Sequence, residues 1–114
     1  MTGLQIEVGE LGARPALALR GELDFGAGDE LEQALAAVER EQPQVIVIDL
    51  RDVTFLDSSG LRTLLAADRR AKSAGRRLAL VPGPESVHRV FEIALLDRRL
   101  TFVGAPEVAA TTDV

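Results

Sequence analysis

Apolar and polar positions alternate at the start of the chain as they do in strands. Residues 4–8, LQIEV, place an apolar side chain at every second position, which is typical of a strand with one face exposed to water. Gly9, Gly12 and Pro15 indicate a turn, and residues 16–23, ALALRGEL, predict a second strand. Because only a short turn separates the two strands, we expect them to form a hairpin.

Helical spacing replaces this alternation in residues 24–41, where apolar side chains recur with acidic residues between them. The apolar positions are Leu31, Ala34, Leu35 and Val38. Pro43 ends this predicted helix. Residues 44–50, QVIVIDL, then form a continuous apolar run with many β-branched side chains. Such a run predicts a strand that is buried on both faces, as in parallel sheets.

A second helix is expected to begin near Ser58 and to end at Gly75, which is a good C-terminal stop. Its apolar face consists of Leu61, Leu64 and Leu65. Asp68 falls close to the same face. We expect this carboxylate to lie beyond the edge of the core, paired with Lys72 four residues further on.

The last third of the chain repeats the strand and helix pattern. Residues 77–81, RLALV, predict a fourth strand, and residues 100–103, LTFV, predict a short last one. Between them, a set of apolar residues matches the helical template at every position. This set is Val87, Val90, Phe91, Ala94 and Leu95. Residues 105–114 are expected to form a weak final helix or a frayed tail.

The predicted order ββαβαβαβ, with a weak α at the end, places the chain in the α/β class. Alternation of strands and helices implies a mostly parallel, mixed sheet of about five strands with helices packed on it. The opening hairpin supplies an antiparallel edge. We expect one domain over residues 1–114, with its core in about residues 4–104.

Composition removes several classes of function. The 114 residues are 46% hydrophobic and carry a net charge of −5, which disfavours a nucleic-acid surface because phosphates need clustered cations. The chain has no cysteine and one histidine, so we expect no disulfide, metal centre or other cofactor. Neither a secretory signal nor a membrane-spanning segment is recognisable. We therefore expect a soluble, cytoplasmic domain.

The stretch FLDSSGL, residues 55–61, is the candidate functional site. Asp57, Ser58 and Ser59 lie after the third strand and before the second helix, where sites form in open α/β sheets. The simplest alternative is a helix cap, because Asp and Ser oxygens accept hydrogen bonds from the first amides of a helix.

Enzyme chemistry is poorly supported. A serine hydrolase would need a G-x-S-x-G turn and a base, but the one candidate, His88, is expected to be exposed on the third helix. A phosphoacceptor at Asp57 or Asp49 would need further acidic residues for magnesium, and a phosphate-binding P-loop motif is absent. We therefore expect no enzyme. A hydroxyl at a helix N-terminus can, however, carry a phosphate, since the dipole and free amides favour an anion.

The chain resembles the STAS domain family of bacterial anti-sigma factor antagonists. VIVIDLRDVTFLDSSGLRTLLAADRRAKSAGRRLALV is similar to the central signature of that family. LRGELDFGAGDEL resembles its second strand and entry to the first helix, and VHRVFEIALLDRRLTFV resembles its third helix and last strand. The similarity covers roughly residues 4 to 104.

The resemblance implies a partner-switching module without catalytic activity. The unmodified antagonist would bind an anti-sigma factor, a serine kinase of the GHKL type, and so release a sigma factor. Phosphorylation of Ser58 would end the binding, and a phosphatase of the PP2C type would restore it. The resemblance also implies a docking face that includes Glu22, Asp24, Asp57, Ser59 and Gly60. For Asp24, an ordinary cap of the first helix remains an equal alternative.

Other functions of the same fold remain open. The chain could be a STAS subunit on the cytoplasmic face of a lipid-transport ABC complex, or a scaffold in a stress-sensing complex. Either would use the Asp57–Ser59 loop as a contact without a phosphate. The complete L-D-S-S-G-L motif favours the antagonist.

Overall fold

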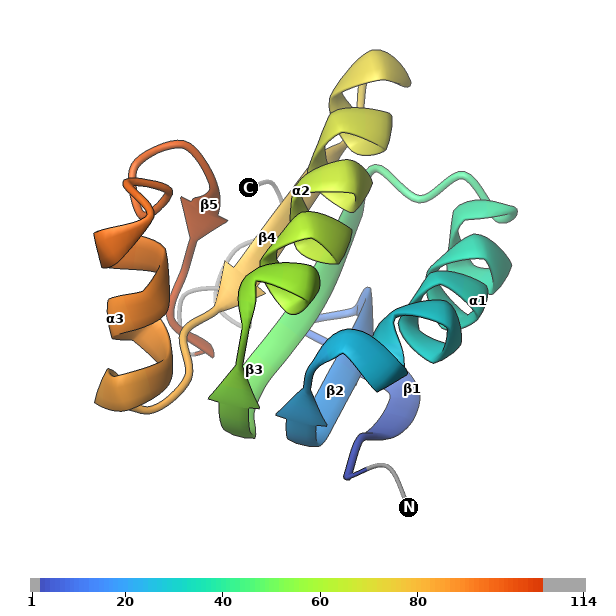
Figure 1. The fold of residues 1–114 in the computed structure, drawn as a ribbon. Coiled ribbons are helices and arrows are strands. Elements are labelled where there is room, and N and C mark those ends of the chain that lie inside the picture. The colour runs from blue at the N-terminus through green and yellow to red at the C-terminus, as the bar shows by residue number, and fades with distance from the viewer. Residues whose placement is uncertain (1–2, 106–114) are drawn as a thin grey trace.

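Five strands form one sheet in the same order as in the sequence, β1-β2-β3-β4-β5 (Figure 1). The computed structural model describes residues 3–105. The strands are β1 Gln5–Leu11, β2 Arg14–Leu23, β3 Val45–Leu56, β4 Arg77–Val81 and β5 Thr101–Phe102. The helices are the short 3₁₀ helix η1 Phe25–Ala27, then α1 Gly28–Glu39, α2 Ser58–Ser73 and α3 Glu85–Ile93.

The pairing of the strands confirms the predicted mixed sheet. β1 pairs with β2 in the antiparallel sense, as an N-terminal hairpin should. The pairs β2–β3, β3–β4 and β4–β5 are all parallel. Each parallel connection runs through one of the three helices, and all three helices lie on the same face of the sheet (Figure 1). The carboxyl ends of β2 and β3, and the starts of η1 and α2, therefore meet at one edge of the molecule.

The main core lies between this face of the sheet and the helices. It contains buried residues of all three helices, such as Leu35, Leu64 and Phe91, packed with Leu17 and Ile48 of the sheet. A smaller cluster occupies the opposite face of the sheet. It consists of Ala16, Val45, Val47, Ala79 and Val81. Side chains of β3 contribute to both clusters, which confirms the prediction of a strand buried on both faces.

Two elements near the expected site begin or end elsewhere than predicted. β3 continues to Leu56, six residues past the apolar run, because its second half still pairs with β2 through Leu23. The first helix does not begin at residue 24. Asp24 caps η1, and regular α-helix begins only at Gly28. The weak final helix or tail was expected over residues 105–114, and its last nine residues, 106–114, lie outside the described part of the chain.

The prediction for the end of the third helix was also wrong. α3 ends at Ile93, and Leu95 adopts the left-handed conformation with φ of 61°. The amide of Leu96 donates to the carbonyl oxygen of Phe91 at 2.8 Å, which is the long bond of a Schellman closure. Leu96 then packs against the main core and Leu95 is left exposed. Periodicity could not reveal this reversal of the chain.

Asp68 is paired as predicted but lies in a different environment. Its carboxylate is 3.1 Å from the ammonium group of Lys72. The residue is only 6% exposed, whereas the sequence placed it beyond the edge of the core. Surrounding residues thus shield most of the Asp68 side chain from water. The exposed ammonium group of Lys72 balances its negative charge.

Candidate functional site

The candidate site forms where β2 and β3 end side by side. Leu23 and Leu56 are the last paired residues of the two strands. The amide of Asp57 donates to the carbonyl oxygen of Leu23 at 3.4 Å. This bond ties the entrance of α2 to the end of β2, and it brings two segments more than thirty residues apart in the sequence into contact.

An irregularity in β2 shapes this edge. The register with β3 shifts between Gly21 and Glu22, which is the mark of a β-bulge. Gly21 has φ of 103°, and a Cβ at this position would lie 1.6 Å from the carbonyl oxygen of Gly3. Only glycine fits here. The bulge leaves Glu22 exposed on the strand and directs the chain towards Asp24.

Asp57 caps α2, as the simplest interpretation of the sequence proposed. Its Oδ1 accepts a hydrogen bond from the amide of Gly60 at 3.0 Å, and its carbonyl oxygen accepts from Leu61 at 3.0 Å. These bonds fix the first turn of the helix. The amides of Ser58 and Ser59 have no intrahelical acceptor at this end of a helix, so they remain available to an anion.

Gly60 allows α2 to approach β2 very closely. A Cβ built on Gly60 would lie 2.4 Å from the carbonyl oxygen of Leu23 and 2.7 Å from a methyl carbon of Leu56. The glycine therefore brings the helix start into direct contact with the strand ends. Leu61 and Leu64 are buried in the core and hold the helix in this position.

Ser58 is exposed and is the first residue of α2. Ser59 is partly buried, and its carbonyl oxygen accepts a hydrogen bond from the Thr63 hydroxyl at 3.2 Å. Of the two hydroxyls, that of Ser58 is thus the more accessible to another protein. A phosphate there would meet the positive end of the helix dipole.

Asp24 has the same local design as Asp57. Its Oδ1 accepts from the amide of Gly26 at 3.0 Å, and its carbonyl oxygen accepts from Ala27 at 3.0 Å. It caps η1 and not the first α-helix, which corrects the capping alternative drawn from the sequence. The structure brings all the predicted site residues to one edge. These residues are Glu22, Asp24, Asp57, Ser58, Ser59 and Gly60.

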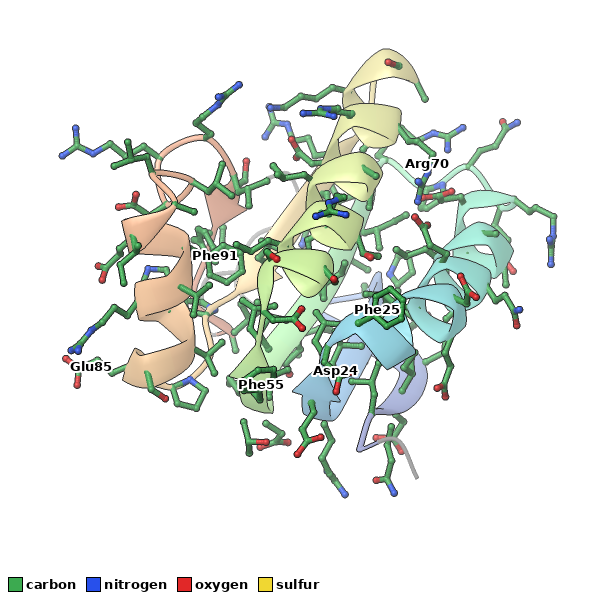
Figure 2. The ribbon with its side chains drawn as sticks, in the orientation of Figure 1. Asp24, Phe25, Phe55, Arg70, Glu85 and Phe91 are labelled. Atoms are coloured by element: carbon green, nitrogen blue, oxygen red, sulfur yellow. The ribbon has the colours of Figure 1, made fainter. Side chains whose placement is uncertain are left out.

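Sequence reasoning assigned no role to two aromatic residues in these segments. Phe25, directly after Asp24, is 85% exposed, and Phe55, two residues before Asp57, is 49% exposed. Figure 2 shows Phe55 at the arrowhead of β3 and Phe25 over η1, on either side of Asp24. Their position in the sequence beside the two capping aspartates was a signal that could have identified them.

Asp49 and His88, the residues considered for enzyme chemistry, make contacts unrelated to catalysis. Asp49 is held by Arg51 in a two-pronged ion pair with N–O distances of 2.7 and 2.9 Å. Burial alone would raise the pKa of Asp49, but hydrogen bonds from the Arg51 side chain and amide outweigh burial and lower it. His88 was expected to be exposed, but its ring packs edge-on against Phe102 at 4.8 Å. Among residues 3–105, no group of three His, Cys, Asp or Glu side chains could hold a metal ion.

Comparison with known proteins identifies a matching family and similar proteins. Residues 6–105 match the family model described as "Mlab, STAS domain". The anti-sigma F factor antagonist of Paenibacillus polymyxa is 30% identical over 92 residues, which cover 80% of this chain and 79% of that protein. None of the helices described between residues 3 and 105 has the length and hydropathy that a membrane span requires.

Solved structures show the same architecture. The crystal structure of an anti-sigma factor antagonist from Mycobacterium paratuberculosis is 27% identical, with a TM-score of 0.74 over 96% of this chain and 88% of that one. The anti-sigma factor antagonist SpoIIAA in its unphosphorylated form is 21% identical, with a TM-score of 0.73 over 90% and 91% of the two chains. At 21% identity, the similarity to SpoIIAA shows a shared fold only. On the family model, the curated relative and the shared architecture together, the chain belongs to the STAS domain family, among the relatives of bacterial anti-sigma factor antagonists.

Proposed function

We propose that this STAS domain is an anti-sigma factor antagonist that is switched by phosphorylation of Ser58. One observation carries the proposal: an exposed serine begins α2, next to the aspartate that caps that helix and close to a second capped turn at Asp24. The family relatives named as antagonists support the same function.

In this function the protein is a substrate and a binding module, not an enzyme. Its unmodified form binds an anti-sigma factor, a serine kinase of the GHKL type, in the cytoplasm and thereby releases a sigma factor. The kinase transfers phosphate to Ser58 and dissociates, and a phosphatase of the PP2C type regenerates the binding form. Glu22, Asp24, Asp57, Ser59 and Gly60 form or support the docking face.

The test of this function is the site of the phosphate. Incubation with each GHKL-type anti-sigma factor kinase of the source organism and ATP should add one phosphate, which mass spectrometry of peptides should locate on Ser58. The Ser58→Ala variant should take up none, whereas the Ser59→Ala variant, which retains Ser58, should still take up one phosphate, even if more slowly. Stoichiometric labelling of Ser58→Ala, for example on Ser59, would contradict the assignment.

The same experiment separates the antagonist from the other functions of the fold. A lipid-transport accessory subunit or a stress-complex scaffold would bind its partner without taking up phosphate. A transporter ATPase that co-purifies with the protein, together with no labelling by any of the kinases, would support the accessory subunit instead.

We expect Asp24 and Asp57 to contribute to docking beyond their role as caps. Asp24→Ala and Asp57→Ala should each lower the free energy of unfolding by about 1 kcal/mol, as lost caps do. Because each carboxylate also stands at the docking face, each variant should bind the kinase at least about tenfold more weakly. Thermal unfolding and calorimetric titration measure the two effects. If each variant loses the expected stability but binds the kinase with unchanged affinity, the two residues act only as caps.

A further inference from the structure

Two of the four phenylalanines of this protein lie outside the core. Phe91 is fully buried, and Phe102 packs against it with the ring centroids 5.0 Å apart. Phe25 and Phe55 instead expose 85% and 49% of their surface. Single exposed apolar residues are ordinary on protein surfaces. These two, however, lie in η1 and at the end of β3, the two segments that meet at the candidate site.

Both rings lie on elements whose positions are fixed by hydrogen bonds at the candidate site. Phe25 begins η1, whose turn is closed by the hydrogen bond from Gly26 to Asp24. Phe55 pairs with Glu22 across β2 and β3, one step before the last pair of the two strands. The bond from Asp57 to Leu23 connects the two segments. The rings therefore have fixed positions relative to Ser58.

The two segments that carry the rings are acidic in sequence. Glu22, Asp24 and Asp57 lie in the same two segments as the phenylalanines, and residues 21–26 and 54–60 contain no Lys or Arg. The nearest cations along the chain are Arg20, directly before the first segment, and Arg51 and Arg62 on either side of the second. We call Glu22, Asp24, Phe25, Phe55, Asp57 and Ser58 the strand-end face. It combines two apolar rings with three carboxylates and one hydroxyl.

We propose that Phe25 and Phe55 are the apolar anchors by which the strand-end face holds its protein partner. The partner would present an apolar pocket for the two rings, with Lys or Arg side chains on its border facing Glu22, Asp24 and Asp57. This inference rests on the proposed function, because it takes the partner to be the anti-sigma factor kinase. It adds the residues that supply affinity and the chemistry of the surface that receives them.

Physical arguments favour this role for the rings. Aromatic side chains are enriched in protein interfaces, and a few buried ones carry much of the binding energy. Carboxylates at the border of such a patch add charge complementarity, which selects a cationic partner and rejects an acidic one. Ser58, three residues after Phe55 in the sequence, would then be brought to the active site of the kinase by contacts that do not involve the hydroxyl itself.

The experiment compares Phe25→Ala and Phe55→Ala with the wild type. Calorimetric titration with each purified GHKL-type anti-sigma factor kinase of the source organism should show affinity reduced at least about tenfold for each variant. Steady-state phosphorylation of Ser58 should show a raised KM with kcat unchanged, because neither ring touches the transferred phosphate. Ile93→Ala is the matched control: Ile93 is 75% exposed, on α3, and its variant should bind like the wild type.

Each other outcome has a definite meaning. Equal affinity of the wild type and both Phe variants would overturn the inference and leave the proposed function intact. No binding or labelling of the wild type by any of these kinases would overturn the proposed function, and this inference with it. Sedimentation of the protein alone provides the last check. A dimer that Phe25→Ala dissociates would assign the rings to a second copy of the chain, and would also overturn the inference.

Discussion

A phosphate on Ser58 should weaken binding to the anti-sigma factor by about a hundredfold or more. The group carries roughly −1.5 to −2 charges at neutral pH. Docking would have to remove this charge from water beside Asp57, and a buried charge without a matched partner costs several kcal/mol. Since about 1.4 kcal/mol changes affinity tenfold, part of that cost already gives the expected loss.

The fold should remain unchanged when the phosphate is added. Ser58 is exposed, and the cap of α2 uses the Asp57 side chain and the amide of Gly60, not the serine hydroxyl. The free amides at the helix start and its dipole favour the anion and offset its repulsion from Asp57. We therefore expect the proposed switch to act through local charge at the docking face.

Calorimetric titration of the kinase with unmodified, phosphorylated and Ser58→Asp protein measures this effect, alongside amide NMR spectra of each form. Ser58→Asp should give a smaller loss than the phosphate, because it has less charge and fewer acceptor oxygens. Ser58→Ala should bind constitutively. Ser86→Asp, which puts the same charge in the first turn of α3 at another exposed serine, should bind normally. Equal affinity of all forms would refute the switch, and a global change in the spectra would refute its local nature.

Gly60→Ala should be strongly destabilising, by about 3 kcal/mol, at the upper end of what overpacking usually costs. The added methyl would lie 2.4 Å from the backbone oxygen of Leu23, and backbone held in a sheet cannot move aside as a flexible side chain does. To relieve the clash, α2 must shift away from β2, which strains the bond between Asp57 and Leu23.

Thermal and urea unfolding measure this loss, which should lower the melting temperature by roughly 10–20 °C for a domain of this size. Gly9→Ala is the control, because a Cβ at Gly9 would meet no atom within 4 Å. That variant should be as stable as the wild type or slightly more so. Similar melting temperatures for the two variants would show that the start of α2 is not confined by β2. Gly60→Ala should also be phosphorylated more slowly at a temperature where it is still folded, since Ser58 shifts with the helix.

The sequence sufficed for the architecture because its patterns are local. The β-branched run at Val45–Ile48 and the leucines of α2 each indicated one element and its buried face, and alternation of these elements led to the mixed sheet. Asp57 and Ser58 were recognisable because caps and helix starts depend on a few consecutive residues. Their neighbours in the sequence therefore contained the necessary information.

Features decided by tertiary packing were not predictable in this way. Periodicity placed Leu95 on the apolar face, but the chain reverses at Leu95 and the partly buried Leu96 packs against the core instead. The second half of β3 could not be predicted from periodicity, because Asp52 and Thr54 interrupt the apolar run. It is a strand because it pairs with β2. The positions of Phe25 and Phe55 beside the capping aspartates pointed to the site, but their exposure of 85% and 49% became known only from the fold.

The direct attachment of α2 to the end of β2 has a kinetic consequence. Because the bond between Asp57 and Leu23 and the close approach at Gly60 fix both halves of the edge, no loop has to become ordered when a partner arrives. Docking of surfaces that are already in their bound shape loses little conformational entropy. Association is then limited by diffusion and orientation, and the lifetime of the complex is set by dissociation. If Ser58 is phosphorylated as we propose, we therefore expect the modification to act mainly by shortening the residence time of the complex.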